Sequence, residues 1–130
     1  MKKRLLVLIA AVLLTGCKST QTLAEKESRC IAYKDTVKSQ IEYENSIAEN
    51  PSPSHSWTFE LEEIFFSNKL NTCVYVEGKG LYDGPTNVAT GYVIKDFYNN
   101  RELQSFTVKT DREFTGKLNE FEKYIEEIKT

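Results

Sequence analysis

The 130-residue chain has few of the side chains on which catalytic and metal centres usually depend. It contains one histidine, three cysteines, one tryptophan and three prolines. His55 and the cysteines lie far apart in the sequence and lack the close spacing typical of zinc ligands. Gly78-Lys79-Gly80 lacks the longer frame of a phosphate-binding loop and a following helix. We therefore expect neither a metal nor a cofactor.

Long hydrophobic runs are also missing from the sequence. Residues 5–14 form a run of ten apolar residues, whereas a membrane-spanning helix needs about 20. This run follows the basic start Met1-Lys2-Lys3-Arg4, an arrangement typical of a secretory signal peptide. We interpret residues 1–16 as a signal peptide rather than a membrane span.

The apolar run ends in Leu14-Thr15-Gly16-Cys17, which resembles the lipobox of bacterial lipoproteins. The resemblance implies that the Cys17 sulfur receives a diacylglyceryl group, that the chain is cut before Cys17 and that the new amine is acylated. Two or three acyl chains form a stable membrane anchor, where one is marginal. Lys18 follows the cysteine, which by the same resemblance implies the outer membrane of a Gram-negative envelope, or the outer surface of a Gram-positive one. The alternatives are an ordinary signal peptide and a hydrophobic helix whose cysteine is incidental.

Without the signal peptide 114 residues remain, a length typical of one domain. We expect a tether at residues 17–21 and a single α+β domain at residues 22–130. This part keeps 14 of the 17 basic residues and all 19 acidic residues, a formal charge of −5. A nucleic-acid partner is not expected, because such partners bind basic surfaces. The same charge argues against a basic membrane-binding patch and leaves the lipid as the expected contact with the membrane.

Cys30 and Cys73 are the two cysteines left once Cys17 is lipidated. Export to an oxidising compartment makes them candidates for a disulfide. A bridge between them would stabilise the fold by about 4 kcal/mol in the chain-entropy treatment. The alternative is a pair of free, buried thiols that pack as small apolar side chains.

Two segments of the chain have helical periodicity. Residues 22–48 begin with the capping box Thr22-Leu23-Ala24-Glu25 and contain neither proline nor glycine. Their apolar stripe consists of Cys30, Tyr33, Val37, Ile41 and Ala48. Residues 110–128 begin with a second capping box, and their stripe consists of Phe114, Leu118, Phe121, Ile125 and Ile128. We predict an amphipathic helix in each segment.

Four segments between these helices are predicted as strands, at residues 57–66, 72–76, 88–98 and 103–109. The alternation slips at Glu62-Glu63, which indicates a bulge or a strand end covered on both sides. Residues 78–87, with three glycines and a proline, are predicted to form a loop, and Asn99-Asn100 a tight turn. The expected fold is α+β, with an N-terminal helix, a four-stranded antiparallel sheet and a C-terminal helix. We expect both helices to pack on one sheet face.

The aromatic residues offer the best material for a binding surface. The chain carries fifteen of them, and most are expected in the core. With both helices on one face, the other face of the sheet would be open, and tyrosine suits recognition surfaces. The candidate surface consists of Tyr75, Leu81, Tyr82 and Tyr92. We predict a non-enzymatic binding or accessory protein of the bacterial cell envelope whose partner is another envelope or extracellular protein. A phage-exclusion or receptor-masking lipoprotein is a narrower version.

A cell-envelope hydrolase is the alternative function. It would use His55 or the carboxylate pairs at residues 62–63 and 126–127. However, neighbouring side chains on a strand point to opposite faces and those on a helix diverge, and nothing marks a nucleophile near the histidine. A third possibility is a structural subunit that docks by its C-terminal apolar stripe. Residues 63–75 resemble hairpins of small bacterial proteins without an assigned activity, and this resemblance implies no function.

Overall fold

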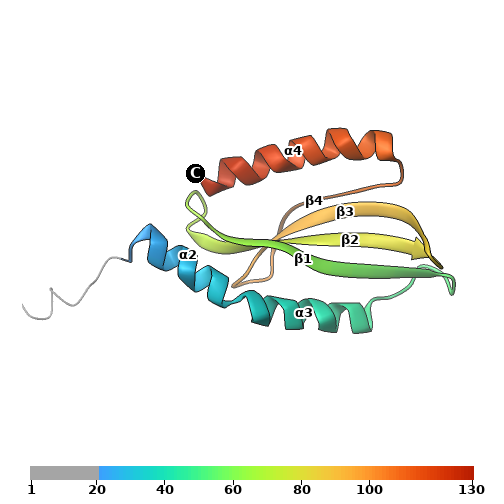
Figure 1. Cartoon of the computed structure of the whole chain (residues 1–130), viewed down its shortest axis with the longest axis horizontal. Helices are drawn as coiled ribbons and strands as arrows, with labels where there is room; N and C mark the ends of the chain where they lie inside the picture. Colours follow the sequence, from blue (N-terminus) through green and yellow to red (C-terminus); the bar gives the residue numbers. More distant parts are fainter. Residues whose placement is uncertain (1–20) are drawn as a thin grey trace, which may run out of the picture.

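The computed structural model of the chain describes residues 21–130. The elements in chain order are α2 (Leu23–Ala32), α3 (Lys34–Ile47), β1 (His55–Ser67), β2 (Thr72–Asp83), β3 (Thr86–Asp96), β4 (Glu102–Val108) and α4 (Asp111–Lys129). The strands form one antiparallel sheet in the order β1-β2-β3-β4 (Figure 1). The predicted α+β class and order of elements are confirmed. The predicted signal peptide and Cys17 lie outside the described residues.

The N-terminal helices and α4 lie on opposite faces of the sheet (Figure 1). The core on one face consists of Val74, Val76, Ile94, Phe121, Ile125 and Ile128. Tyr75, which lies between the two valines, packs with Val37 and Ile41 of α3 on the other face. The prediction that both helices share one face is therefore wrong. Strand β2 has buried apolar side chains at consecutive positions, and because these alternate between faces, each face needs its own cover.

The predicted N-terminal helix is present but consists of two helices that meet at Tyr33. The Tyr33 N–H donates to the Cys30 carbonyl at 3.1 Å, a tighter turn than that of an α-helix. The Tyr33 ring stacks on Phe97, with 4.3 Å between the ring centroids. The turn at Tyr33 thus coincides with an aromatic contact to the segment after β3.

The predicted disulfide between Cys30 and Cys73 is formed, with 5.5 Å between the two Cα atoms. It joins α2 to the first residues of β2, and both cysteines are buried. The Cys73 side chain therefore faces α2. Within the described residues, no helix is long and apolar enough to cross a membrane.

The predicted bulge lies in β1, where Glu62 is inserted between Leu61, opposite Glu77, and Glu63, opposite Val76. The predicted loop at residues 78–87 is wrong. Residues 78–83 continue β2, and the connection to β3 is a turn at residues 84–85. Residues 78–83 each pair with a residue of β1 on one side and with a residue of β3 on the other. Pairing on both sides overrides the low strand propensity of glycine.

The outer edge of β1 is blocked by a side chain from α3. The Asn45 amide donates to the Phe59 carbonyl at 2.8 Å, and its oxygen accepts from the Phe59 N–H at 2.7 Å. These two bonds imitate one step of strand pairing. They fasten α3 to the edge of the sheet and occupy backbone groups that would otherwise be free to pair with another chain.

Candidate functional site

Helix α4 crosses its sheet face obliquely and leaves part of that face open. Near the start of the helix, Phe114 packs against Phe106 of β4, with 6.1 Å between ring centroids. At its end, the Ile128 carbonyl accepts from the Ser67 hydroxyl at the end of β1. The helix therefore runs from over β4 toward the end of β1. The earlier part of β1 and the later part of β2 remain uncovered on this face.

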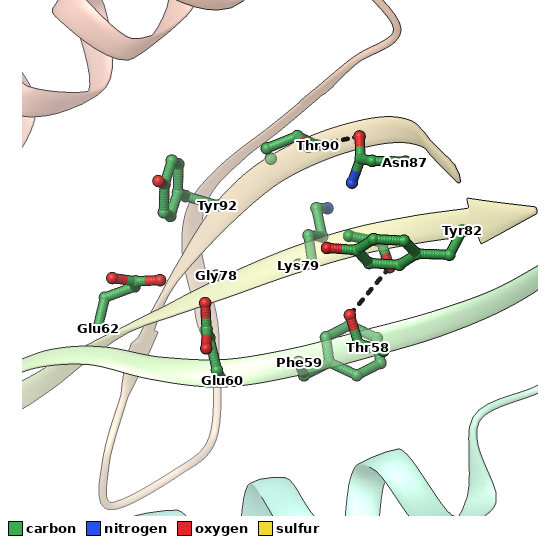
Figure 2. Close-up of a pocket in the computed structure, with 12 residues that line it drawn as sticks. Thr58, Phe59, Glu60, Glu62, Gly78, Lys79, Tyr82, Asn87, Thr90 and Tyr92 are labelled. Atoms are coloured by element: carbon green, nitrogen blue, oxygen red, sulfur yellow. Dashed lines mark hydrogen bonds between the residues drawn. The ribbon is translucent and has the colours of Figure 1, made fainter. Parts of the chain in front are cut away.

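Two hollows with volumes of about 560 and 200 Å³ lie along this uncovered region. The larger is lined by Glu62, Glu63, Val76, Tyr92, Leu118, Phe121, Glu122, Ile125, Glu126 and Lys129. The smaller is lined by Thr58, Phe59, Glu60, Glu62, Gly78, Lys79, Gly80, Tyr82, Asn87, Thr90, Gly91 and Tyr92 (Figure 2). Both share Glu62 and Tyr92, so they form one continuous depression, which we call the acidic groove.

Apolar side chains form the floor of the acidic groove under α4, and the backbone of β2 forms it farther along that strand. Val76 and Phe121 are buried core residues that also line the larger hollow. At Gly78 the absence of a side chain lets the Glu62 carboxylate lie against the sheet. A Cβ added there would be 2.6 Å from the Glu62 Oε1 atom. The glycine therefore sets the depth of the groove and the position of this carboxylate.

Three carboxylates line the acidic groove together with Tyr92, namely Glu60, Glu62 and Glu122. Burial raises the pKa of Tyr92, and the negative charges of Glu62, Glu60 and Glu122 raise it further. Partial burial and the neighbouring Glu60 also raise the pKa of Glu62. In Figure 2 the side chains of Glu60, Glu62 and Tyr92 gather over the same part of the sheet. This part of the groove carries a concentrated negative potential.

Basic side chains compensate little of this charge. Lys129 bonds to Glu63 at 2.8 Å and lies 3.8 Å from Glu126 at one end of the larger hollow. Lys79 pairs with Phe59, whose side chain packs in the core of the α3 face. The Lys79 side chain therefore leaves the sheet on the opposite face from the groove. The arrangement suits a partner group that is positively charged and has apolar area to bury.

Two of the four residues in the predicted binding surface lie in the groove, namely Tyr82 and Tyr92. Tyr75 is 1% exposed, and its hydroxyl donates to Asn100 Oδ1 at 2.9 Å on the α3 face. Leu81 follows Tyr75 on β2 by an even number of residues, so its half-buried side chain lies on that same face. The prediction of one surface from all four residues is wrong, because strand alternation separates them.

The sequence analysis considered Glu62, Glu63 and Glu126 as catalytic carboxylates, but it missed that they gather with Glu60 and Glu122 in one groove. Glu60 and Glu62 alternate with Phe59 and Leu61, a pattern that already places both on the face opposite those apolar residues. The bulge then brings Glu63 to the same face, since it shifts the alternation by one residue. What the sequence does not contain is the position of α4, which supplies Glu122.

A buried charge cluster occupies the opposite face. Glu77 is 1% exposed, and its Oε1 atom lies 3.4 Å from the Lys95 Nζ, which is also 3.4 Å from Glu44. The second carboxylate oxygen of Glu77 has no hydrogen-bond partner. Burial raises the pKa of Glu77 to about 7, opposed by the charge of Lys95 and assisted by that of Glu44. This cluster is a source of pH-dependent stability.

The histidine considered for catalysis, His55, is the first residue of β1. Its Nδ1 atom is 3.1 Å from the Ser54 hydroxyl and is also bonded to the Ser52 hydroxyl. Neither hollow of the acidic groove is lined by His55 or by these serines. Among residues 21–130, no three His, Cys, Asp or Glu side chains are grouped to hold a metal ion.

Comparisons with known proteins return no relative of this chain. No protein-family model, no curated protein and no solved structure matches it.

Proposed function

We propose that this chain is a lipid-anchored protein of the bacterial cell envelope that binds another protein without catalysing a reaction. The acidic groove is the observation that carries the binding role. Its apolar floor and its carboxylates suit a partner segment in which an apolar side chain is flanked by lysine or arginine. The lipid anchor is supported by the Leu14-Thr15-Gly16-Cys17 sequence, and the outer membrane by Lys18.

The disulfide supports the envelope location independently of the lipobox. Cys30 and Cys73 are paired and buried, and such bonds persist in exported proteins but are rare in the reducing cytosol. A domain that is fastened in this way and tethered to a membrane presents its groove at a defined distance from the bilayer. This arrangement is suited to an accessory subunit of a larger envelope protein.

The first test is cross-linking in intact cells. The tagged full-length protein is captured, and its partners are identified by mass spectrometry beside a Cys17→Ser control. We expect one abundant envelope protein, which is lost or reduced in the control because the untethered domain is no longer concentrated at the membrane. Recovery of the same partner at the same level with Cys17→Ser would show that the lipid anchor is not needed for partner binding.

A second test asks whether the groove makes the contact. Charge reversal at its centre, Glu62→Lys with Glu122→Lys, is expected to abolish capture, because like charges would then face the basic partner segment. A matched control, Glu42→Lys with Asp35→Lys, changes the net charge equally at exposed positions of α3. Loss of the partner in the control, or its retention in the groove variant, would contradict the proposal.

A cell-envelope hydrolase is a second candidate because Glu60 and Glu62 are paired in the groove. Both line the smaller hollow, and the negative charge of Glu60 raises the pKa of Glu62. Glycosidases place their two carboxyl groups on either side of the bond that they cleave, whereas Glu60 and Glu62 extend from the same face of one strand. This arrangement favours binding over hydrolysis. If Glu60→Gln abolished the effect of the protein on the cell envelope and left partner capture unchanged, the hydrolase would be favoured instead.

A further inference from the structure

One end of the domain gathers exposed apolar side chains from three separate segments. Helix α2, the turn after β1 and the turn after β3 meet there, and the described part of the chain begins at the same end (Figure 1). Four side chains of this end, Leu23, Ile31, Leu70 and Tyr98, are 46%, 59%, 38% and 62% exposed. We call this surface, formed by α2 and residues 68–71 and 97–101, the basal end.

The basal end holds an apolar notch behind Ile31. The notch has a volume of about 240 Å³ and is lined by Glu27, Ile31, Ile64, Phe65, Phe66 and Lys129. It continues the exposed apolar area of α2 onto the edge of the sheet. The other large hydrophobic residues exposed in the described part of the chain, Tyr43 and Ile47, lie on α3 instead.

The segments that form this apolar surface carry more basic than acidic side chains, although the chain as a whole is acidic. The basal segments carry Lys26, Arg29, Lys69 and Arg101. The Lys26 ammonium lies 5.2 Å from the centre of the Phe66 ring and donates to Asn71 Oδ1 at 3.3 Å. Of the two acids on α2, Glu25 is engaged in the helix cap, where it accepts from the Thr22 N–H. Apolar and tyrosine side chains ringed by cations are the composition of a surface that lies on phospholipid headgroups.

The length of the tether places the basal end next to the membrane. Four residues separate Cys17 from Thr22, the cap of α2, and the five residue steps span at most about 17 Å. The disulfide holds α2 rigidly on the sheet. A lipid on Cys17 therefore holds this particular surface within reach of the bilayer.

We infer that the basal end rests on the phospholipid surface, an orientation that depends on the lipid anchor of the proposed function. Leu23, Ile31, Leu70 and Tyr98 enter the headgroup layer, and the surrounding lysines and arginines contact anionic phosphates. The acidic groove, which follows β1 and β2 away from the basal end, then faces the space in which a partner is met. The lipid on Cys17 and the basal end are then two linked contacts with the same membrane.

The test measures the depth of single tryptophans in vesicles. Residues 17–130 are coupled through the Cys17 thiol to a maleimide lipid in vesicles of phosphatidylethanolamine and phosphatidylglycerol with brominated acyl chains. In a Trp57→Phe background, tryptophan is introduced by Ile31→Trp, by Leu70→Trp or, as the control, by Ile47→Trp. Ile47 is 57% exposed, as Ile31 is at 59%, but it lies outside the basal end.

We expect bromine quenching and a blue shift of the emission for the variants at residues 31 and 70. The control at residue 47 should show neither. Equal quenching at all three positions, or none at residues 31 and 70, would overturn the proposal. Hydrogen exchange of the unaltered domain on the same vesicles repeats the test without substitutions, with protection expected in α2 and residues 68–71 and not at the end of α3.

Chemical coupling separates this inference from the proposed anchor. The intact mass of the protein purified from cells shows whether Cys17 is acylated in vivo. An unmodified Cys17 removes the lipid anchor of the proposed function, while the vesicle measurement still reports whether the basal end contacts phospholipid. Acylation without protection of the basal end rejects the docking surface alone.

Discussion

The two faces of the sheet are covered by helices that are held in different ways. On one face, the small apolar core of α3 and Tyr75 is supplemented by fastenings at points: a disulfide at Cys30, the paired hydrogen bonds of Asn45, and the bridge from Glu44 to Lys95. On the other face, α4 is held by an apolar and aromatic core around Phe121. Point fastenings permit a polar, partly charged interface, whereas a helix held by packing needs an apolar stripe. The open groove lies on the packed face, where α4 crosses obliquely and is bonded to β1 at its C-terminal end, through Ser67 and Glu63.

The largest effect is expected from the disulfide. The double substitution Cys30→Ser with Cys73→Ser should lower the free energy of unfolding by about 4 kcal/mol, because it frees a 43-residue loop of the unfolded chain. Urea unfolding followed by Trp57 fluorescence measures the change. Reductant should destabilise the native chain and leave the double variant unaffected. Identical midpoints for the oxidised native chain and the variant would show that the first face does not depend on this bond.

On the other face, Phe121→Ala should cost about 3 kcal/mol or more, since Phe121 is 2% exposed and its removal leaves a cavity beneath α4. The comparison between faces is sharpened by hydrogen exchange on the folded variant. Exchange should rise in α4 more than in α2 and α3, which keep their own fastenings. An equal rise in all three helices would mean that the two faces unfold as one unit.

The buried Glu77 makes the first face sensitive to pH. Its pKa is about 7 in the folded chain against an ordinary value of 4.5, so the folded state binds the proton more tightly than the unfolded state. Below about pH 4.5, Glu77 makes its full contribution to the free energy of unfolding. This contribution is lost as the pH rises through 7, and the free energy of unfolding falls by about 3 kcal/mol in all. The stability of Glu77→Gln relative to the native chain should therefore increase between pH 4 and pH 8. Glu42→Gln, at an exposed position of α3, is the control, and the same trend in it would contradict this origin.

The smallest effect is expected at the strand edge. Asn45→Ala removes both hydrogen bonds to Phe59 and should cost about 1–2 kcal/mol, while it exposes the edge of β1. Sedimentation should show self-association that increases with protein concentration. Asn50→Ala, at an exposed position in the connection between α3 and β1, should leave the chain monomeric. A variant at Asn45 that is destabilised but remains monomeric would show that the amide serves attachment of α3 alone.

Local patterns in the sequence were enough to predict most of the elements. The capping boxes at Thr22 and Thr110 and the apolar stripes that follow them depend on neighbours within one or two helical turns, and both helices are present. The bulge was predictable because an extra residue interrupts a period of two at Glu62. The disulfide was predictable because two cysteines remain after Cys17 is assigned to the lipid.

The remaining features depend on contacts between segments that are distant in the sequence. The glycines at residues 78 and 80 indicate a loop by propensity, yet β1 and β3 pair with them on both sides and make them a strand. The apolar stripe of α4 is compatible with either face of the sheet. In the structure the N-terminal helices, joined to the sheet by the disulfide, cover one face, and α4 covers the other.

The sequence by itself determined the types and order of the elements, the partners of the disulfide and the residues that resemble a lipobox, because each rests on local periodicity or on the supply of one residue type. The tertiary structure alone decided which face each helix covers, and hence that Tyr75 is buried while Tyr82 and Tyr92 line a groove. It also decided that carboxylates from β1 and α4 converge there. The physical reason is that a binding surface is formed by the position of one element relative to another, which local sequence patterns do not encode.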